Sequence, residues 1–117
     1  MSHPFHADDV DVDPDRARQL IEAGEVQLVD VREQHEWDAG RIAGARHIEL
    51  ERVAAEAGTL DRDRPLLFYC RLGARSGMAA NAFRRAGYDA YSVDGGLTEW
   101  DRRGHPLDPE DGTVADH

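Results

Sequence analysis

One stretch decides the fold of this chain, residues 66–80, which read Leu66-Leu67-Phe68-Tyr69-Cys70-Arg71-Leu72-Gly73-Ala74-Arg75-Ser76-Gly77-Met78-Ala79-Ala80. The first four residues are apolar or aromatic, as expected of a β-strand covered on both faces. The only cysteine of the protein, Cys70, follows this strand directly, and a loop with a glycine and two arginines leads into a helix of small residues. A thiol in this place faces backbone N–H groups and the positive end of a helix dipole, and both favour the thiolate. The stretch therefore predicts a reactive cysteine in an anion-binding cradle.

The composition limits what the chain can be. Its 117 residues are 40% hydrophobic and 32% charged, which is typical of a single soluble globular domain. The formal net charge is −10, and all 14 positive residues are arginines. This balance argues against nucleic acid and membrane surfaces as partners, so an anionic substrate must be attracted locally, by the loop arginines. The single cysteine excludes an intramolecular disulfide, and no signal or membrane-spanning segment is visible, so we expect a cytoplasmic protein.

Hydrophobic periodicity predicts strands that alternate with helices. Strands are expected over residues 26–31, 45–48, 66–69 and 88–93, and helices or helical turns over 14–23, 32–40, 51–57, 76–86 and 97–103. This alternation predicts an α/β fold with a central, mostly parallel sheet of about five strands and helices on both faces. The core is expected to include Trp37, Trp100 and one face of the 76–86 helix, listed here by residue: Met78, Ala79, Ala82, Phe83 and Ala86.

The two ends of the chain differ from its middle in composition. Residues 1–9 are polar and aperiodic and predict an N-terminal tail. Residues 10–107 form the predicted domain, and the acidic residues 108–117 predict a disordered C-terminal tail. In parallel sheets catalytic groups gather at the carboxyl ends of the strands, where Asp30, Cys70 and Asp94 are expected.

The loop and three further segments resemble the rhodanese family of sulfurtransferases. The resemblance rests on Cys70-Arg71-Leu72-Gly73-Ala74-Arg75-Ser76, Leu28-Val29-Asp30-Val31-Arg32-Glu33, Glu36-Trp37-Asp38-Ala39-Gly40-Arg41-Ile42-Ala43-Gly44-Ala45 and Asp94-Gly95-Gly96-Leu97-Thr98-Glu99-Trp100. In order and spacing these segments cover residues 10–107. Arg41 stands where the family often has histidine and Glu49 where proline is common, but neither lies in the loop.

The resemblance implies a rhodanese-like fold and a double displacement on Cys70. The Cys70 thiolate takes the outer sulfur of an anionic donor such as thiosulfate and becomes a persulfide, and a second nucleophile, cyanide or a thiol, removes that sulfur. The N–H groups of Arg71, Leu72, Gly73, Ala74, Arg75 and Ser76 would hold the charged sulfur. The basic loop is similar to loops of thiosulfate-using members rather than mercaptopyruvate-using ones. No cofactor and no metal is expected, and a sulfur-relay protein is a further possible partner.

Some roles stay open at this point. Arg75 either binds the substrate or persulfide, or forms an ion pair, for example with Asp30, that shapes the loop. Asp30, Arg32 and Asp94 are expected to support the site, and Asp30 and Arg32 more often form structural ion pairs than act directly.

The sequence leaves two other functions to consider. Four residues separate Cys70 from Arg75, one fewer than in the cysteine loop of protein-phosphatase-like enzymes, so the loop favours a single sulfur atom and disfavours phosphatase or arsenate reductase activity. A non-enzymatic sulfur-carrier or interaction module is the remaining alternative, although such a module is expected to lack the cysteine.

Overall fold

The computed structural model describes residues 9–117. The predicted N-terminal tail, residues 1–9, therefore lies outside the described residues except for Asp9. The elements, in chain order, are β1 (Asp11–Val12), α1 (Pro14–Glu22), β2 (Gln27–Asp30), α2 (Gln34–Ala39), β3 (Arg46–His47), α3 (Leu50–Val53), the 3-10 turn η1 (Ala57–Thr59), β4 (Leu66–Tyr69), α4 (Ala74–Arg85), β5 (Ala90–Val93) and α5 (Gly96–Arg102).

The five strands form one sheet in the order β1-β5-β4-β2-β3, and every neighbouring pair is parallel. The predicted α/β fold with a parallel sheet is confirmed. The edge strand β1 was not predicted, because its two residues are too few to show a hydrophobic period. The sheet recruits it through backbone pairing of Asp11 with Ser92 of β5.

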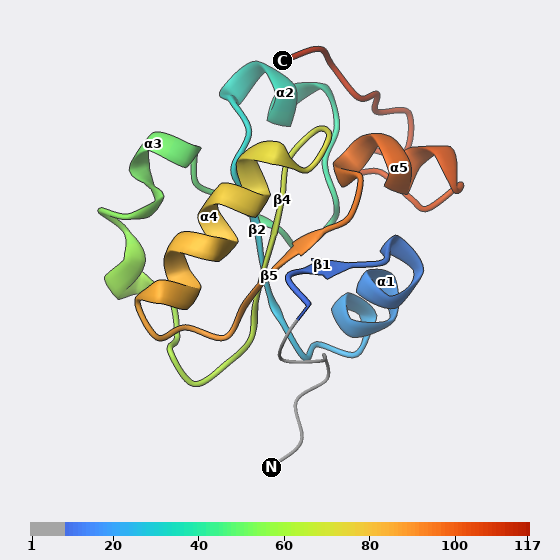
Figure 1. Ribbon diagram of the computed structural model, residues 1–117. Helices are drawn as coiled ribbons and strands as arrows, with labels where there is room; N and C mark the ends of the chain where they lie inside the picture. Colours follow the sequence, from blue (N-terminus) through green and yellow to red (C-terminus); the bar gives the residue numbers. More distant parts are fainter. Residues whose placement is uncertain (1–8) are drawn as a thin grey trace.

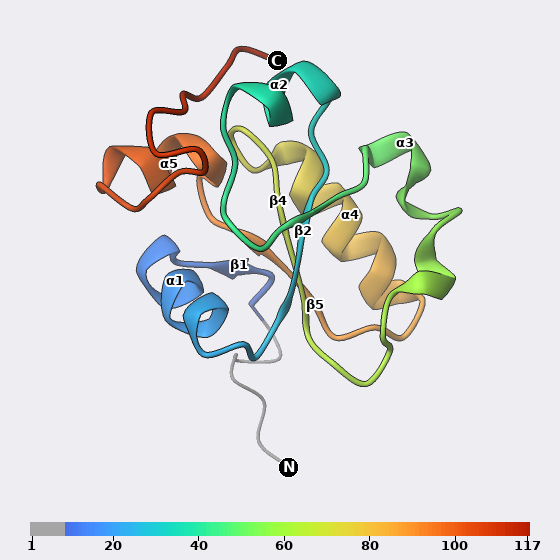
Figure 2. The same cartoon turned by 180° about the vertical axis from the view of Figure 1, so that it is seen from behind.

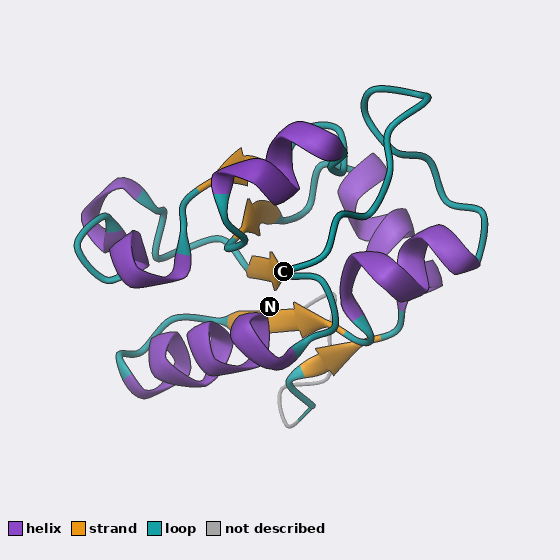
Figure 3. Cartoon of the chain, turned by 90° about the horizontal axis from the view of Figure 1, so that it is seen from above, coloured by secondary structure: helices purple, strands orange, loops and turns teal. Residues whose placement is uncertain are grey.

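Helices cover both faces of this sheet, α3 and α4 on one and α1 and α5 on the other (Figures 1 and 3). The central strand β4 is completely buried, and its side chains alternate between two hydrophobic clusters. Leu66 and Phe68 join the cluster beneath α4, while Leu67 and Tyr69 join the cluster beneath α1 and α5. The continuous apolar run before Cys70 is thus explained by a strand with a core on each side.

The helix after the cysteine begins at Ala74, two residues earlier than predicted, and its buried face differs from the predicted one. Ala79 and Phe83 are buried as expected, but Met78 is 64% exposed, and Ala82 and Ala86 are exposed as well. The reason is that Ser76 faces the sheet, where it contacts Cys70 and Ser92, which sets the rotation of the whole helix. The spacing of apolar residues alone could not fix that rotation.

The two tryptophans have different environments. Trp100 is buried, as predicted. Trp37 is only half-buried, and its ring stacks on His47 with the centroids 4.9 Å apart. The inward position on α2 belongs instead to Glu36, which is completely buried.

The acidic segment 108–117 was predicted to be disordered, but it packs against the domain. Asp108 pairs with Arg41 through two backbone hydrogen bonds, Arg41 N–H to Asp108 O at 3.0 Å and Asp108 N–H to Arg41 O at 2.7 Å. The Thr113 N–H donates to Ala39 O at 2.8 Å. Backbone pairing of this kind orders a segment whose composition alone predicts disorder. Both views of the chain place its C-terminal end beside α2 (Figures 1 and 2).

No helix within residues 9–117 has the length and hydrophobicity needed to cross a membrane.

Candidate active site

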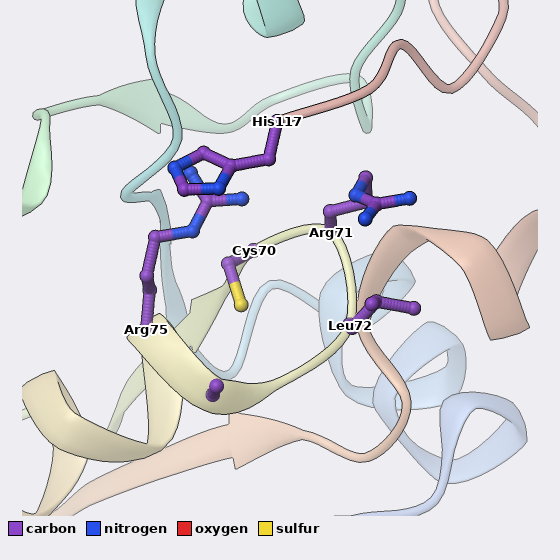
Figure 4. A pocket seen from close by; sticks show the side chains of 6 residues that line it. Cys70, Arg71, Leu72, Arg75 and His117 are labelled. Atoms are coloured by element: carbon purple, nitrogen blue, oxygen red, sulfur yellow. The ribbon is translucent and has the colours of Figure 1, made fainter.

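Cys70 lies at the carboxyl end of β4, where the chain turns toward α4, and it is 1% exposed. Its Sγ accepts hydrogen bonds from Gly73 N–H at 3.0 Å and from Ser76 N–H at 3.4 Å. The Ser76 hydroxyl lies 3.3 Å from the same sulfur. Figure 4 shows the sulfur pointing from Cys70 toward the loop that surrounds it. Two of the six predicted backbone donors, those of Gly73 and Ser76, therefore face the sulfur.

Gly73 gives the loop its curvature and forms the N-cap of α4. Its φ is +111°, a conformation that residues with a Cβ adopt only under strain. Among residues 9–117, no acceptor is found for the N–H groups of Ala74 and Arg75, as expected for the first turn of a helix. The first turn of α4 therefore has free donors next to the sulfur, together with the positive end of its dipole.

Two buried serines support the sulfur from below. Ser92, in β5, and Ser76, in α4, have their hydroxyl oxygens 2.7 Å apart. The Ser76 hydroxyl can donate to Gly73 O at 3.2 Å, and in its contacts with Cys70 Sγ and with the Ser92 hydroxyl either atom can be the donor. The pair links the sheet, the loop and the sulfur in one hydrogen-bonded chain.

The start of α5 is packed against the start of the cysteine loop. Leu97 N–H donates to Cys70 O at 2.8 Å and Thr98 N–H to Arg71 O at 3.0 Å. A Cβ on Gly96 would lie 2.5 Å from Cys70 O, so only glycine allows this approach. The Gly95-Gly96 pair thus lets the start of α5 bind the carbonyl groups of Cys70 and Arg71.

Arg75 forms an ion pair, but with Glu36 and not with Asp30. Its two terminal nitrogens lie 2.8 and 2.9 Å from the two Glu36 oxygens, which is the bidentate geometry that arginine prefers. Burial alone would raise the pKa of Glu36, but the hydrogen bonds from Arg75 and from Glu33 N–H outweigh it and hold that pKa below its ordinary value. The same hydrogen bonds raise the pKa of Arg75. Both groups are charged, and the loop is tied to α2.

Asp30 and Arg32 form a second, completely buried pair. Arg32 donates to both Asp30 oxygens, at 2.7 to 3.0 Å, and to Gly40 O at 2.8 Å. Desolvation alone would lower the pKa of Arg32, but the hydrogen bonds to Asp30 raise it. Burial, and then the charge of Asp30, raise the pKa of Tyr69 well above its ordinary value, so its hydroxyl stays neutral and accepts from Ile42 N–H. This pair positions the segment 40–42, and neither member lines the pocket at Cys70.

The pocket above Cys70 has a volume of about 170 Å³ and is lined by Cys70, Arg71, Leu72, Ala74, Arg75 and His117. Pockets for drug-sized molecules start at about 300 Å³, so this one suits a small ion. Arg71 is partly exposed at its edge, and its nearest charged partner is Asp116, at 3.7 Å. Asp94, the third predicted strand-end residue, does not line this pocket. It is exposed beside β1, where burial and then the charge of Asp94 raise the pKa of Asp11.

The structure adds residues that sequence reasoning missed or left aside. No role was predicted for Glu36, although it begins the Glu36–Ala45 segment on which the family resemblance rests. Ser92 gave no signal, because a serine in an otherwise apolar strand is common. His117 lay in a segment for which disorder was expected. Within residues 9–117 no group of three or more potential metal ligands gathers in one place.

Comparison with known proteins now identifies the family. Residues 13–103 match the rhodanese-like domain family. The chain belongs to this family. It is 41% identical over 100 residues, 85% of this chain and 89% of the relative, to the thiosulfate sulfurtransferase GlpE of Pseudomonas aeruginosa.

Two further relatives show the range of proteins in which this domain occurs. The HTH-type transcriptional regulator Rv0324 of Mycobacterium tuberculosis is 43% identical over 90 residues, which cover 74% of this chain and 39% of the regulator. The crystal structure of a rhodanese-related protein from Thermoplasma volcanium superposes with a TM-score of 0.78 at 26% identity, covering 83% of this chain and 95% of that one. The rhodanese-like chain described here thus shares its fold with both small proteins and parts of larger ones.

Proposed function

We propose that this rhodanese-like chain is a sulfurtransferase that moves sulfane sulfur from thiosulfate, or a similar small anionic donor, to a thiophilic acceptor through a persulfide on Cys70. One observation carries the proposal: the Cys70 sulfur accepts hydrogen bonds from two loop N–H groups, and it lies at the floor of a small pocket with Arg71 at its edge. The identity of 41% to a thiosulfate sulfurtransferase over most of both chains supports the reaction class. A cytoplasmic location is part of the proposal.

The first half-reaction forms the persulfide. The Cys70 thiolate attacks the outer sulfur of thiosulfate, a new S–S bond forms, and the S–S bond of thiosulfate breaks, so that sulfite leaves with the electron pair. Arg71 attracts the dianion, and the free N–H groups at the first turn of α4 receive the charge on the outer sulfur. No external oxidant or reductant is needed.

The second half-reaction restores the thiolate. Cyanide or a thiolate attacks the terminal sulfur of the persulfide, forms a C–S or S–S bond with it, and Cys70 leaves as the thiolate. Gly73 N–H and Ser76 N–H already face the Cys70 sulfur, so they stabilise the leaving group without rearrangement.

The arrangement of Arg75 argues against phosphoryl or arsenyl chemistry. A phosphatase needs its loop arginine to face the equatorial oxygens of the bound group, as arginine does in phosphoryl-transfer sites generally. Here both terminal nitrogens of Arg75 are bound to Glu36. In the proposed reaction Arg75 is a positioning residue, and Asp30 and Arg32 support the neighbouring segment 40–42.

Intact-mass spectrometry tests the proposal, because Cys70 is the only cysteine. Incubation with thiosulfate is expected to add the mass of one sulfur atom, cyanide to remove it as thiocyanate, and Cys70→Ser to show neither. A protein that thiosulfate leaves unmodified, but that gains sulfur from a persulfidated protein, would instead be a sulfur-carrier module. Turnover of an aryl phosphate would overturn the reaction class.

A further inference from the structure

The C-terminal strap, residues 108–117, leads from the edge of the domain to the mouth of the Cys70 pocket. It begins at the backbone pair between Asp108 and Arg41 and passes α2 (Figure 2). Its last residue, His117, lines the pocket. Figure 4 shows the His117 side chain entering from this segment on the side of Arg75. A segment outside the family match at residues 13–103 therefore forms part of the pocket wall.

The strap is docked by close backbone contact. A Cβ on Gly40 would lie 2.6 Å from Thr113 O, and a Cβ on Gly112 would lie 2.9 Å from Pro109 O and 3.1 Å from Ala39 O. The space between the two glycines thus fits bare backbone only. The hydrogen bond from Thr113 N–H to Ala39 O, at 2.8 Å, fixes the register of this contact.

Beyond the glycine contact, polar side chains hold the last two residues over the site. The His35 ring lies 2.9 Å from Asp116 O. The Asp116 carboxylate lies 3.7 Å from Arg71, and the His117 ring 3.2 Å from a Glu33 oxygen. Each of these contacts is at least partly exposed and therefore weak on its own, so the position of the strap end depends mainly on the backbone contact at Gly40 and Gly112. Because Arg71 belongs to the cysteine loop and lines the pocket, the Asp116 carboxylate competes with an anion in the pocket for the Arg71 guanidinium.

We propose that the C-terminal strap sets the size of the molecules that reach Cys70. In the docked position its residue His117 narrows the mouth of a pocket of about 170 Å³ over Cys70, which is 1% exposed. A mouth of this size admits a small donor and a small acceptor and excludes thiols and persulfides carried on another protein. The nature of the donor rests on the proposed function, but the control of access does not.

Two thiol reagents of the same chemistry and different size test this inference. N-ethylmaleimide and a polyethylene-glycol maleimide are reacted with the full chain, and the rate of modification of Cys70 by each is followed by mass. Gly112→Ala is expected to raise the ratio of the polymer rate to the small-reagent rate about fivefold, the effect of losing about one backbone hydrogen bond from the docked state. Gly58→Ala is the matched control, since a Cβ there meets nothing within 4 Å, and it should leave the ratio unchanged.

A second variant keeps the test decisive if Gly112→Ala disturbs folding. His117→Ala removes a side chain from the pocket wall without touching the glycine contact and is expected to raise the same ratio. Equal ratios in the wild type, Gly112→Ala and His117→Ala would overturn the inference, and so would an equal rise in Gly58→Ala. Failure of the proposed function looks different: thiosulfate would leave the wild-type mass unchanged whatever the maleimide ratios are.

Discussion

The bidentate pair between Arg75 and Glu36 should hold the cysteine loop in shape, and its strength can be worked from the structure. The Glu36 side chain is completely buried and that of Arg75 is 17% exposed. Removing one partner of a fully buried pair costs about 3–5 kcal/mol. Because Arg75 can regain some water, we expect Glu36→Gln to lower the free energy of unfolding by about 2–3 kcal/mol. Gln keeps an acceptor for Glu33 N–H, so the loss belongs mainly to the pair.

A double-mutant cycle isolates that interaction. Glu36→Gln, Arg75→Met and the double variant are unfolded in urea and followed by tryptophan fluorescence. We expect a coupling free energy of about 2 kcal/mol, since independent sites are additive within about 0.5 kcal/mol. The control is Glu25→Gln, an exposed residue in a loop, which should change stability by less than about 0.5 kcal/mol. A coupling within the additive range would refute the view of Arg75 as a brace.

The same variants separate the two roles of Arg75 that the sequence left open. If Arg75 positions the loop through Glu36, both single variants should reduce the rate of Cys70 persulfide formation to a similar extent. If Arg75 instead binds the donor, Arg75→Met should raise the KM for thiosulfate while Glu36→Gln leaves it unchanged. Persulfide formation and KM are measured by mass and by thiocyanate production. Because both terminal nitrogens of Arg75 bond to Glu36, we expect similar losses in the two single variants.

Three further changes have defined outcomes. Gly96→Ala places a Cβ 2.5 Å from Cys70 O and also forces a positive φ on alanine, so thermal unfolding should show a loss of about 2–4 kcal/mol and the alkylation rate of Cys70 should change. Ser92→Ala leaves the Ser76 hydroxyl without its partner at 2.7 Å, and should cost about 1–2 kcal/mol in urea unfolding and slow persulfide formation. The third change is in pH. The pKa of Glu36 is lowered in the folded protein, so ionised Glu36 stabilises the fold at any pH above the ordinary carboxyl pKa of about 4.3. This stabilisation is lost as the pH falls through the lower pKa of the folded state, so unfolding followed by circular dichroism should show the wild type losing stability below about pH 4 more steeply than Glu36→Gln.

The sequence predicted the elements whose signals are local. The apolar run before Cys70 predicted β4, and the helices expected over residues 14–23 and 97–103 are present as α1 and α5, with ends within one residue of the expected ones. The N–H groups around Cys70 were predictable for the same reason. When a helix directly follows a buried strand, the first N–H groups of the helix have no partner within it and face the residue that joins strand and helix.

What the sequence did not predict depends on contacts between distant segments. Arg75 and Glu36 are far apart in the chain, and several acidic residues were equally plausible partners until α2 was placed beside the loop. The exposure of Met78 follows from the contact of Ser76 with Ser92, which no helical period encodes. Docking of the C-terminal strap depends on the absence of side chains at Gly40 and Gly112, and composition carries no trace of such a fit.

The two loop arginines acquire opposite roles from these contacts. Arg75 forms an ion pair with the buried carboxylate of Glu36 and so fixes the cysteine loop relative to α2. Arg71 has its Nε buried without a partner within residues 9–117, and its nearest charged group is the fully exposed Asp116 at 3.7 Å. An ion pair so open to water is worth less than about 1 kcal/mol, so a dianion that enters the pocket can displace it at little cost. In the proposed reaction, the Arg75–Glu36 pair thus holds the cysteine loop in place, while the weak Arg71–Asp116 pair at the pocket edge gives way to the anionic donor.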